Sequence, residues 1–445
     1  MVKVNKHSYL AKGDFVYRHS PAPVFVKATG VVMEDKNGKR YFCAEAANGT
    51  TGLGFDSSII DESFIKIKDI PSIPSFCETE IRLKLAVRLG KKISEITGIE
   101  GHLAFELGGA QGIELALRIA KANNSKSQYA VFEGGYHGRS IFTAQLSASH
   151  RYRSAMGDWR IPVIRLPYPD YEQSGKVMSK KIWQQNYLKQ LDLLASRETG
   201  GMIAKGKEKD VVALIVEPVL NAGGITKPDK EILEKVVETF RRLGAIIIVD
   251  EVFCGFYRTG PMFGFQHYSF TPDIIVMSKA ITNGITPLSC VWAKDPLLIA
   301  KNFPPGSHSA TFVNQPFGLA VADTVLDRYE KWSTLNTDIK YIESRLDGII
   351  QRILKISKHT VSGNTIGALG RILLKHNNAG KILDIARSVA WKNPVNGVHG
   401  LILASTGMAS NVIAINPPLK MKKLDLDTLE GLLMLTFKKA NTEIK

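Results

Sequence analysis

Two ionisable residues, Asp250 and Lys279, each follow an apolar run in the 445-residue sequence. Residues 245–249 and 273–277 are mostly apolar without alternation, which predicts strands covered on both faces. Carboxylate and ammonium groups are costly in such surroundings unless other groups pair with them. Because ligands of open α/β sheets bind at the carboxyl ends of strands, we expect a site where these two residues emerge.

Lys279 has the surroundings of a reactive amine. It follows an apolar strand and precedes Ala280 and a turn made by Thr282, Asn283 and Gly284. A lysine that is desolvated beside other cationic groups has a depressed pKa and can form a Schiff base. The simpler interpretation is an exposed lysine just past the end of a strand.

Asp250 and Val252 are suited to holding a flat, nitrogen-containing ring. A carboxylate beside a pyridinium nitrogen keeps that nitrogen protonated and makes the ring an electron sink. The period of two in a strand places Val252 on the same face as Asp250, where it can pack under the ring. A helix cap or ion pair for Asp250, and an ordinary core position for Val252, are the structural alternatives.

Two further turns follow predicted strands at the same sheet edge. Gly109 and Ala110 begin a predicted helix, whose N-terminal N–H groups favour an anion such as phosphate. Tyr136 follows another strand and offers an aromatic face, whereas the adjacent His137 favours a structural role. Each signal is weak alone, but together with Lys279 and Asp250 they match the needs of pyridoxal phosphate.

The order of apolar segments predicts an α/β fold with a mostly parallel sheet and helices on both faces. Predicted strands alternate with predicted helices, and a smaller α+β unit follows. The sheet strands are expected at 102–107, 129–132, 161–166, 211–216, 245–249, 273–277 and 288–293, and the helices at 78–96, 111–123, 177–195, 229–243, 317–329 and 336–356. Three strands at 372–375, 401–404 and 412–415 and a helix at 424–437 form the expected smaller unit.

We expect two domains. Residues 70–325 form the predicted large, cofactor-binding domain, and residues 1–69 and 326–445 together form the predicted small domain. A chain of this length is long enough to bury the core of both.

Composition restricts the classes of function. The formal net charge is +16, but the basic residues are spread over the whole length and accompany no nucleic-acid-binding motif, so we expect no nucleic-acid site. Four cysteines without CxxC spacing predict neither a disulfide framework nor a metal site. No apolar run approaches the ~18 residues of a membrane span, and we expect a cytoplasmic protein.

Residues 249–288 match the pattern VDEVxxGxxRTGxxFxxxxxxxxPDIxxxxKxxxxGxxPL nearly throughout. The sequence therefore resembles the class III, fold type I, pyridoxal-phosphate-dependent aminotransferases. The resemblance extends over residues 24–437 and includes Gly109-Ala110, Tyr136-His137-Gly138, Glu217-Pro218 and Pro417-Pro418-Leu419. It implies a large domain built on a seven-stranded sheet.

The resemblance also implies a role for each matching residue. Lys279 matches the Schiff-base lysine, Asp250 the partner of the ring nitrogen, and Glu217 an acid that supports the network around the cofactor. Val252 and Tyr136 match the two faces of the ring sandwich, and Gly109 and Ala110 the phosphate donors. Thr311 matches a phosphate-binding threonine supplied by the neighbouring subunit, which implies a homodimer. A ping-pong reaction between an amine donor and a 2-keto acid acceptor follows, with Lys279 moving the proton.

Three departures from the family pattern bear on the substrate. Phe253 stands where many members have Gln. Ala414 replaces the late Arg that holds a substrate α-carboxylate, and Ala222 replaces the acid that screens this Arg. Because both partners are missing together, the gate is absent rather than damaged. The resemblance then favours the branch that acts on ω-amino acids and amines, of the 4-aminobutyrate type. Arg258 is a candidate carboxylate ligand, although a structural role is favoured.

Two alternatives use the same fold differently. An amino-acid racemase or epimerase would return the proton to the opposite face of the substrate carbon and need no acceptor. A non-enzymatic, ligand-binding regulator would bind without turnover, but both Lys279 and Asp250 are present.

Overall fold

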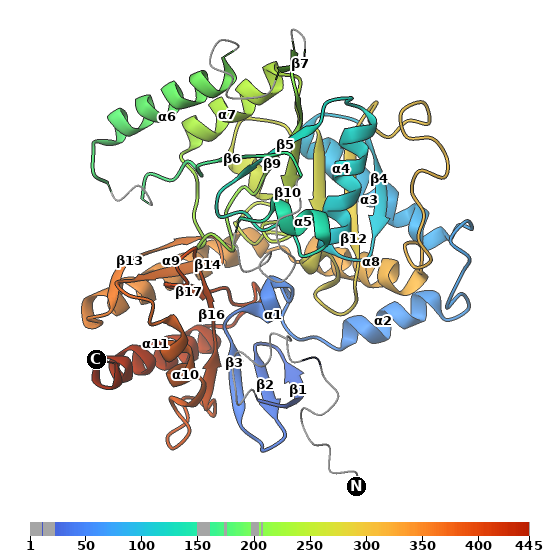
Figure 1. Ribbon diagram of the computed structural model, residues 1–445. Helices are drawn as coiled ribbons and strands as arrows, with labels where there is room; N and C mark the ends of the chain where they lie inside the picture. The colour runs from blue at the N-terminus through green and yellow to red at the C-terminus, as the bar shows by residue number, and fades with distance from the viewer. Residues whose placement is uncertain are drawn as a thin grey trace.

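The centre of the protein is a seven-stranded sheet (Figure 1). In this computed structural model, the structure describes residue 11 and residues 23–148, 161–172, 176–196, 204–205 and 208–444. The strand order is β4-β12-β11-β10-β9-β5-β6. The strands are β4 (Gly101–Glu106), β5 (Gln128–Phe132), β6 (Val163–Leu166), β9 (Val211–Val216), β10 (Ile246–Asp250), β11 (Ile274–Met277) and β12 (Ser289–Lys294).

The sheet is mostly parallel, as predicted. Strand β10 runs parallel to β9 and β11, and the register places Asp250 beside Val276. Only β12 runs antiparallel to both of its neighbours in this sheet. The carboxyl ends of β5, β9, β10 and β11 therefore meet at one edge.

Two hydrophobic cores cover the two faces of the sheet, which explains the continuous apolar runs in the sequence. Along β10, Ile247 and Val249 belong to one core and Ile248 to the other. All three side chains are completely buried. A strand enclosed in this way needs no polar face, so the alternation typical of a half-buried strand is absent.

Helices flank the sheet on both sides and match most of the predicted ranges. Helix α4 packs on one face against β11 and β12, whereas α7 packs on the other against β9 and β10. The helices of this part are α3 (Glu80–Thr97), α4 (Gly109–Ala122), α5 (Ile141–Leu146), α6 (Lys180–Ala195), α7 (Lys230–Arg242) and α8 (Pro316–Glu330), with 3₁₀ turns at η3 (Gly264–His267) and η4 (Lys279–Thr282).

Two smaller sheets carry the N- and C-terminal segments. The first has the order β1-β2-β3-β15 and joins β3 to β15 across most of the chain length. The second has the order β13-β14-β17-β16. Their strands are β1 (Phe25–Thr29), β2 (Val32–Asp35), β3 (Arg40–Cys43), β13 (Thr360–Ile366), β14 (Leu369–Leu374), β15 (Gly400–Ile402), β16 (Ala404–Thr406) and β17 (Val412–Ile415).

The remaining elements complete the chain. They are α1 (Ala46–Gly49), α2 (Ser58–Ile67), α9 (Leu335–Ile356), α10 (Ala379–Ser388), α11 (Lys423–Glu443) and the short pair β7 (Ala204–Lys205) and β8 (Glu208–Lys209). The division into domains at 70–325 and at 1–69 with 326–445 stays a prediction.

The structure corrects the expected secondary structure at several places. The single strand predicted at 401–404 is two strands, β15 and β16, which belong to different sheets. The strand β13 and the helix α10 were not predicted. Strand β13 was missed because it is an edge strand with a polar sequence, Thr-Val-Ser-Gly-Asn-Thr-Ile, and lacks a clear apolar alternation.

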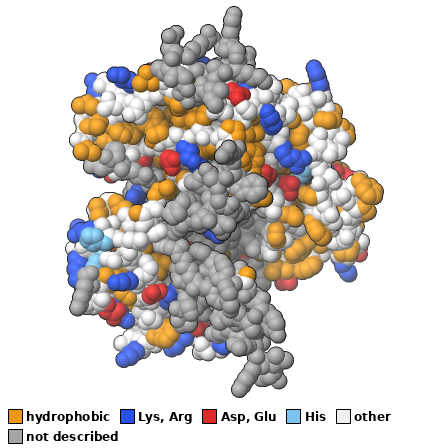
Figure 2. Space-filling view, in the orientation of Figure 1, with side chains coloured by type: hydrophobic (Ala, Val, Ile, Leu, Met, Phe, Trp, Pro, Cys, Tyr) orange, Lys and Arg blue, Asp and Glu red, His pale blue; other side chains and the backbone are white. Residues whose placement is uncertain are grey.

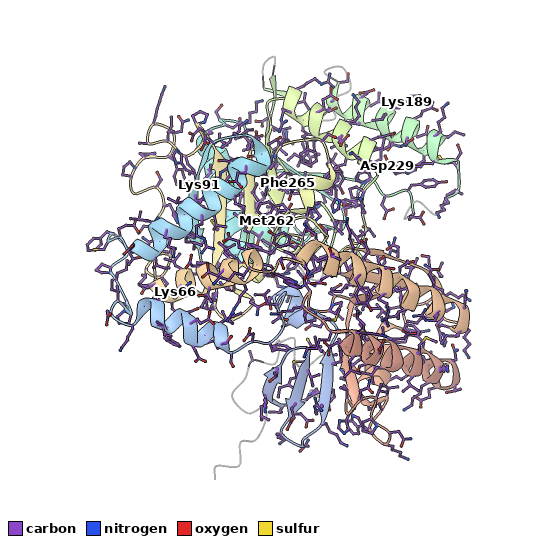
Figure 3. The ribbon with its side chains drawn as sticks, turned by 180° about the vertical axis from the view of Figure 1, so that it is seen from behind. Lys66, Lys91, Lys189, Asp229, Met262 and Phe265 are labelled. Carbon is purple, nitrogen blue, oxygen red and sulfur yellow. The ribbon has the colours of Figure 1, made fainter. Side chains whose placement is uncertain are left out.

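A buried acid ties α8 to the helices around it. The Asp323 side chain is completely buried, and it accepts a hydrogen bond from Lys66 Nζ on α2 at 2.6 Å and another from Arg88 on α3. The two helices α2 and α8 lie side by side, with Lys66 on α2 (Figure 3). Although burial raises the pKa of Asp323, the hydrogen bonds and charges of Lys66 and Arg88 outweigh it and hold the pKa below 3.8.

Among the described residues on the face seen in Figure 2, charged side chains of both signs are interspersed. Lys and Arg side chains lie scattered among apolar and acidic ones. Within the described residues, none of the helices combines the length and hydrophobicity that crossing a membrane requires.

We expect Asp323→Ala to lower the free energy of unfolding. Removing one partner of a buried ion pair costs about 3–5 kcal/mol, and we expect about 2–3 kcal/mol here because Lys66 and Arg88 remain partly exposed. Urea denaturation measures the loss, and Glu330→Ala, at the exposed end of the same network, is the control.

The pH dependence gives a second readout of Asp323. Because its folded pKa lies below 3.8, its contribution is complete above the unfolded value and disappears as pH falls through the folded one. The difference between wild type and Asp323→Ala should therefore be constant from pH 5 to 8 and shrink in strong acid. A difference that persists in strong acid would contradict an electrostatic role.

Candidate active site

A cavity of about 520 Å³ opens at the carboxyl ends of β5, β9, β10 and β11. Its size lies within the range of small-molecule sites. Nine of the thirteen residues assigned to a site by sequence line it, namely Gly109, Ala110, Tyr136, His137, Glu217, Asp250, Val252, Phe253 and Lys279. The structure therefore brings together side chains that are up to 170 positions apart in the sequence.

Asp250 and His137 form the buried centre of the site. His137 Nδ1 lies 2.9 Å from Asp250 Oδ2, and the two side chains are almost completely buried. The other oxygen, Oδ1, accepts a hydrogen bond from Val252 N at 3.0 Å. Burial alone would lower the pKa of His137, but the hydrogen bond and charge of Asp250 outweigh it and raise that pKa above 6.5. The hydrogen bond between the two side chains thus holds the Asp250 carboxyl group in one orientation.

Glu217 connects the ends of two strands. Its carboxylate accepts hydrogen bonds from Tyr136 N at 2.6 Å and from Asn221 N at 3.3 Å. Burial raises the pKa of Glu217 to about 7, His137 opposes this rise, and Asp250 adds to it. Glu217 therefore fixes the turn that presents the Tyr136 ring to the cavity.

Lys279 begins the turn after β11 with a left-handed backbone, at φ 50°. Its side chain is surrounded by protein except where it faces the cavity, and Nζ lies 4.9 Å from the centre of the Phe253 ring. Burial lowers the pKa of Lys279 from its ordinary 10.5, against the opposing charges of Asp250 and Glu217. A lowered pKa increases the fraction of neutral, nucleophilic amine near neutral pH.

Two glycine positions keep room for a planar ligand beside the N-terminus of α4. A Cβ on Gly109 would lie 3.0 Å from Val252 Cγ1, and one on Gly138 would lie 2.6 Å from Ala110 Cβ. Gly138 also has φ 130°, which L side chains rarely adopt. The first N–H groups of α4 face the same space and favour an anion. The residues present thus fit a flat ring that carries a phosphate.

The structure places Thr311 and Arg258 away from the cavity lining. Thr311 is exposed in the loop before α8. Arg258 is 1% exposed, and its Nη1 donates to Pro417 O at 2.5 Å. Burial lowers the pKa of Arg258 to about 10. These contacts favour the structural role for Arg258 over contact with substrate.

Phe253 and Ala414 belong to one apolar cluster next to the cavity. Both are nearly completely buried. Ala222 lies in a loop held to β16 by Thr406 Oγ1, which donates to Ala222 O at 3.0 Å. The cluster is completed by Val219, Ile225, Cys254, Ile366 and Leu369. The side of the cavity next to Phe253 is therefore apolar.

Asn283 is a positioning residue that the sequence did not identify. Its Oδ1 accepts from Leu53 N at 2.9 Å, and its Nδ2 donates to Gly54 O at 2.8 Å. These bonds fasten the N-terminal loop to the turn that carries Lys279. The turn signal at 282–284 was visible in the sequence, but a partner 229 positions away has no local signal.

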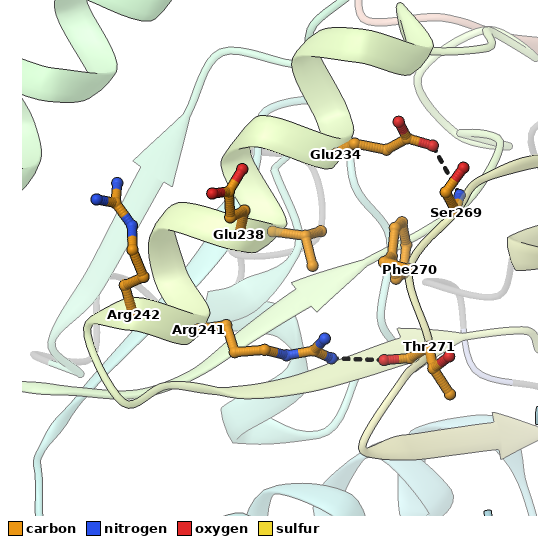
Figure 4. Close-up of a pocket in the computed structure, with 8 residues that line it drawn as sticks. Glu234, Glu238, Arg241, Arg242, Ser269, Phe270 and Thr271 are labelled. Atoms are coloured by element: carbon orange, nitrogen blue, oxygen red, sulfur yellow. Dashed lines mark hydrogen bonds between the residues drawn. The ribbon is translucent and has the colours of Figure 1, made fainter.

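A second cavity of about 550 Å³ lies on the surface between α7 and residues 269–271 (Figure 4). Its polar groups are paired across it: Ser269 N donates to Glu234 Oε1 at 2.6 Å, and Arg241 Nη2 donates to Thr271 O at 2.5 Å. It lies near the starts of β10 and β11, the edge opposite Lys279. Because ligands of this sheet type bind at the other edge, we do not assign the chemistry to it.

Comparison with known proteins decides the family. Residues 16–436 match the model of the class-III aminotransferases. The chain belongs to this family. It is 26% identical to a probable 4-aminobutyrate aminotransferase of Bacillus subtilis, over 92% of this chain and 91% of the relative. It is 24% identical to the acetylornithine aminotransferase of Streptococcus mutans, over 92% and 94% of the two chains.

A solved structure with the same fold is also a transaminase. An amine transaminase from an uncultivated Pseudomonas species, solved in its pyridoxal-phosphate-bound form, superposes with a TM-score of 0.81 at 21% identity. The superposition covers 97% of this chain and 98% of that one. The aminotransferase described here is pyridoxal-phosphate-dependent, as its family is, and the cavity lining fits that cofactor.

We expect Lys279→Ala to abolish both turnover and the absorbance that pyridoxal phosphate gains on covalent attachment. In cofactor-free wild type, the attachment rate should rise with pH and reach its plateau below the 10.5 of an ordinary lysine, because burial lowers the pKa of Lys279. The control is Lys294→Ala, which removes an amine that is paired with Asp273 outside the cavity lining. This variant should leave turnover and cofactor attachment unchanged. Covalent attachment that survives in Lys279→Ala would contradict the assignment.

Proposed function

We propose that this aminotransferase moves an amino group from an ω-amino acid or amine of the 4-aminobutyrate type to a 2-keto acid. The observation that carries the proposal is the apolar cluster around Phe253 and Ala414, in the position of a charged gate. An apolar wall beside the Lys279 amine suits the hydrocarbon chain of a substrate. It offers no cation at Ala414 to bind a substrate α-carboxylate. The probable 4-aminobutyrate aminotransferase among the relatives supports the same donor class.

The roles of the residues follow from their positions. When bound, pyridoxal phosphate supplies a ring that takes up the electron pair of the bond broken at the substrate carbon. The neutral Lys279 amine takes the proton from that carbon and returns one later, as base and then acid. Asp250, oriented by His137, would keep a ring nitrogen protonated. Val252 and Tyr136 would hold the ring from its two faces, and Glu217 fixes the Tyr136 turn.

Arg139 gives the cavity a cationic mouth. Among the described residues that line the cavity, Arg139 is the only arginine, and its guanidinium lies 5.9 Å from the centre of the Tyr136 ring. It is exposed, so it is suited to the distal carboxylate of an ω-amino acid rather than to a group held deep in the site.

We also propose a homodimer in which Thr311 reaches the phosphate site of the partner subunit. Thr311 and Phe312 are exposed, and their loop is joined to residues 73–76 because Asn314 Nδ2 donates to Ser75 O at 2.8 Å. Phe76 is 89% exposed and Phe312 60%. The exposed apolar side chains of this region are Phe64, Ile65, Ile70, Phe76, Leu83, Val87 and Phe312. Such a patch is typical of a protein interface.

The cytoplasmic location stays a prediction. The four cysteines are free, and Cys77 is exposed, which suits a reducing compartment.

A half-reaction with the purified holoenzyme tests the donor class. We expect 4-aminobutyrate and simple primary amines to convert bound cofactor to its aminated form, and pyruvate or 2-ketoglutarate to reverse the change. Acetylornithine is the comparison donor, because relatives with that name are equally similar. Conversion by acetylornithine alone would overturn the donor class. Loss of optical activity from a chiral amino acid without acceptor and without the aminated form would favour the racemase instead.

The interface is tested by Phe312→Asp, which places a charge in the proposed apolar contact. We expect the dimer to dissociate and the affinity for pyridoxal phosphate to fall about tenfold or more, because Thr311 no longer reaches its partner. Light scattering and cofactor titration measure the two effects. Val177→Asp, at an exposed apolar residue outside this region, is the control. A dimeric Phe312→Asp with normal cofactor affinity would exclude this interface.

A further inference from the structure

The loop between β12 and α8 carries Thr311 on a short exposed arch. Thr311 and Phe312 are exposed, whereas the next two residues are buried. The buried Asn314 fastens the C-terminal end of the arch, because its Nδ2 donates to Ser75 O at 2.8 Å. The direction in which Thr311 points therefore depends on how the other end of the arch is held.

His308 holds this N-terminal end, three positions before Thr311. Its ring nitrogen Nε2 lies 2.8 Å from Phe105 O, the backbone carbonyl of β4. A carbonyl oxygen only accepts, so Nε2 carries the hydrogen in this contact. The side chain of His308 is 14% exposed, so little water competes for the bond. Arg118 on α4 donates to Ser307 O and fastens the neighbouring residue.

The second ring nitrogen of His308 faces an acidic side chain. Nδ1 is buried and has no hydrogen-bond partner among the described residues. Glu106 Oε1 lies 3.7 Å from it, which is too long for a hydrogen bond but within reach of an ion pair when the ring is protonated. The ring thus lies between a carbonyl and a carboxylate of consecutive residues. Two polar neighbours fix the orientation of the ring, which apolar packing alone would leave less defined.

The elements that hold the arch also form the phosphate turn of the same subunit. Strand β4 ends at Glu106, and Gly109 begins α4 three positions later. Arg118, which fastens Ser307, belongs to this same helix. Thr311, however, is not among the described residues that line the cavity of its own subunit. The base of the arch is therefore built on one phosphate site, while its exposed tip is available to another.

We propose that His308 is a positioning residue, which holds the arch so that the Thr311 hydroxyl reaches the phosphate bound in the partner subunit. The inference rests on the proposed homodimer, because it assigns the residue that aims Thr311 across the interface. His308 lies outside the cavity lining of its own subunit and acts through the arch. Its loss should therefore weaken cofactor binding in the partner subunit and leave its own cavity intact.

Three variants measure the contribution of the His308 contact to cofactor affinity. We expect His308→Leu, which removes the donor to Phe105 O, to raise the Kd for pyridoxal phosphate about tenfold. His308→Gln keeps an amide that can donate to the same carbonyl, and it should stay within about threefold of wild type. The control is His102→Leu, which removes an exposed imidazole near Asp295 at the start of the same strand and should leave the Kd unchanged.

Hybrid dimers identify the subunit in which His308 acts. Lys279→Ala serves as a marker, because cofactor absorbance then reports only the other subunit. In the first hybrid, one subunit carries Lys279→Ala and His308→Leu and its partner is wild type, so the altered arch serves the reporting site. We expect about tenfold weaker cofactor binding there. In the second hybrid, one subunit carries His308→Leu and its partner Lys279→Ala, so an intact arch serves the reporting site. We expect wild-type affinity within about twofold.

The two hybrids contain the same substitutions and differ only in their distribution, so the second also checks that His308→Leu folds. If the leucine variant is unfolded, His308→Asn, whose amide is too short to reach Phe105 O, gives the same comparison. Weaker binding in the second hybrid alone, or wild-type affinity in both, would overturn the role of His308 and leave the dimer standing. A protein that forms no hybrid would overturn the proposed homodimer together with this inference. Cofactor titration is independent of the amine donor, so a failed donor screen would overturn only the proposed donor class.

Discussion

The burial of charged groups at one edge of the central sheet is the constraint on which the rest of the structure depends. Asp250, His137, Glu217 and Lys279 lie where water is largely excluded, and each persists because another group pairs with it or because its pKa shifts. The hydrogen bond between Asp250 and His137 is the centre of this arrangement. Two apolar cores, one on each face of the sheet, produce the low-dielectric surroundings in which these pairings have their effect.

Local backbone geometry positions Lys279 in the buried site. Lys279 and Asn283 both adopt left-handed φ values at a tight turn, and Asn283 joins that turn to the N-terminal loop at 53–54. The segment that precedes this loop has left-handed φ values at Ala46, Ala47 and Asn48. Strained conformations of this kind persist only when the surrounding contacts fix them, and they gather at functional sites. The Lys279 amine is therefore positioned by the turn at 279–283, which is hydrogen-bonded to the loop at 53–54.

The cavity has an apolar side and a cationic side chain among its lining residues. Phe253 and Ala414 exclude charge from one side of the cavity, whereas Arg139 offers a guanidinium at its mouth.

The sequence by itself determined the fold class, the strands β9 and β17 to the residue, and nine residues of the cavity lining. The fold class and the strands were accessible because continuous apolar runs are local properties of the chain, whereas residues such as Glu217 and Phe253 were identified only through the family resemblance. Only the tertiary structure decided the partner of Asp250 and the clamp made by Asn283. Each depends on contacts between segments more than 40 positions apart, or on strand register, which leave no signal in local sequence. The polar edge strand β13 escaped prediction for a related reason: its partner β14, not its own composition, makes it a strand.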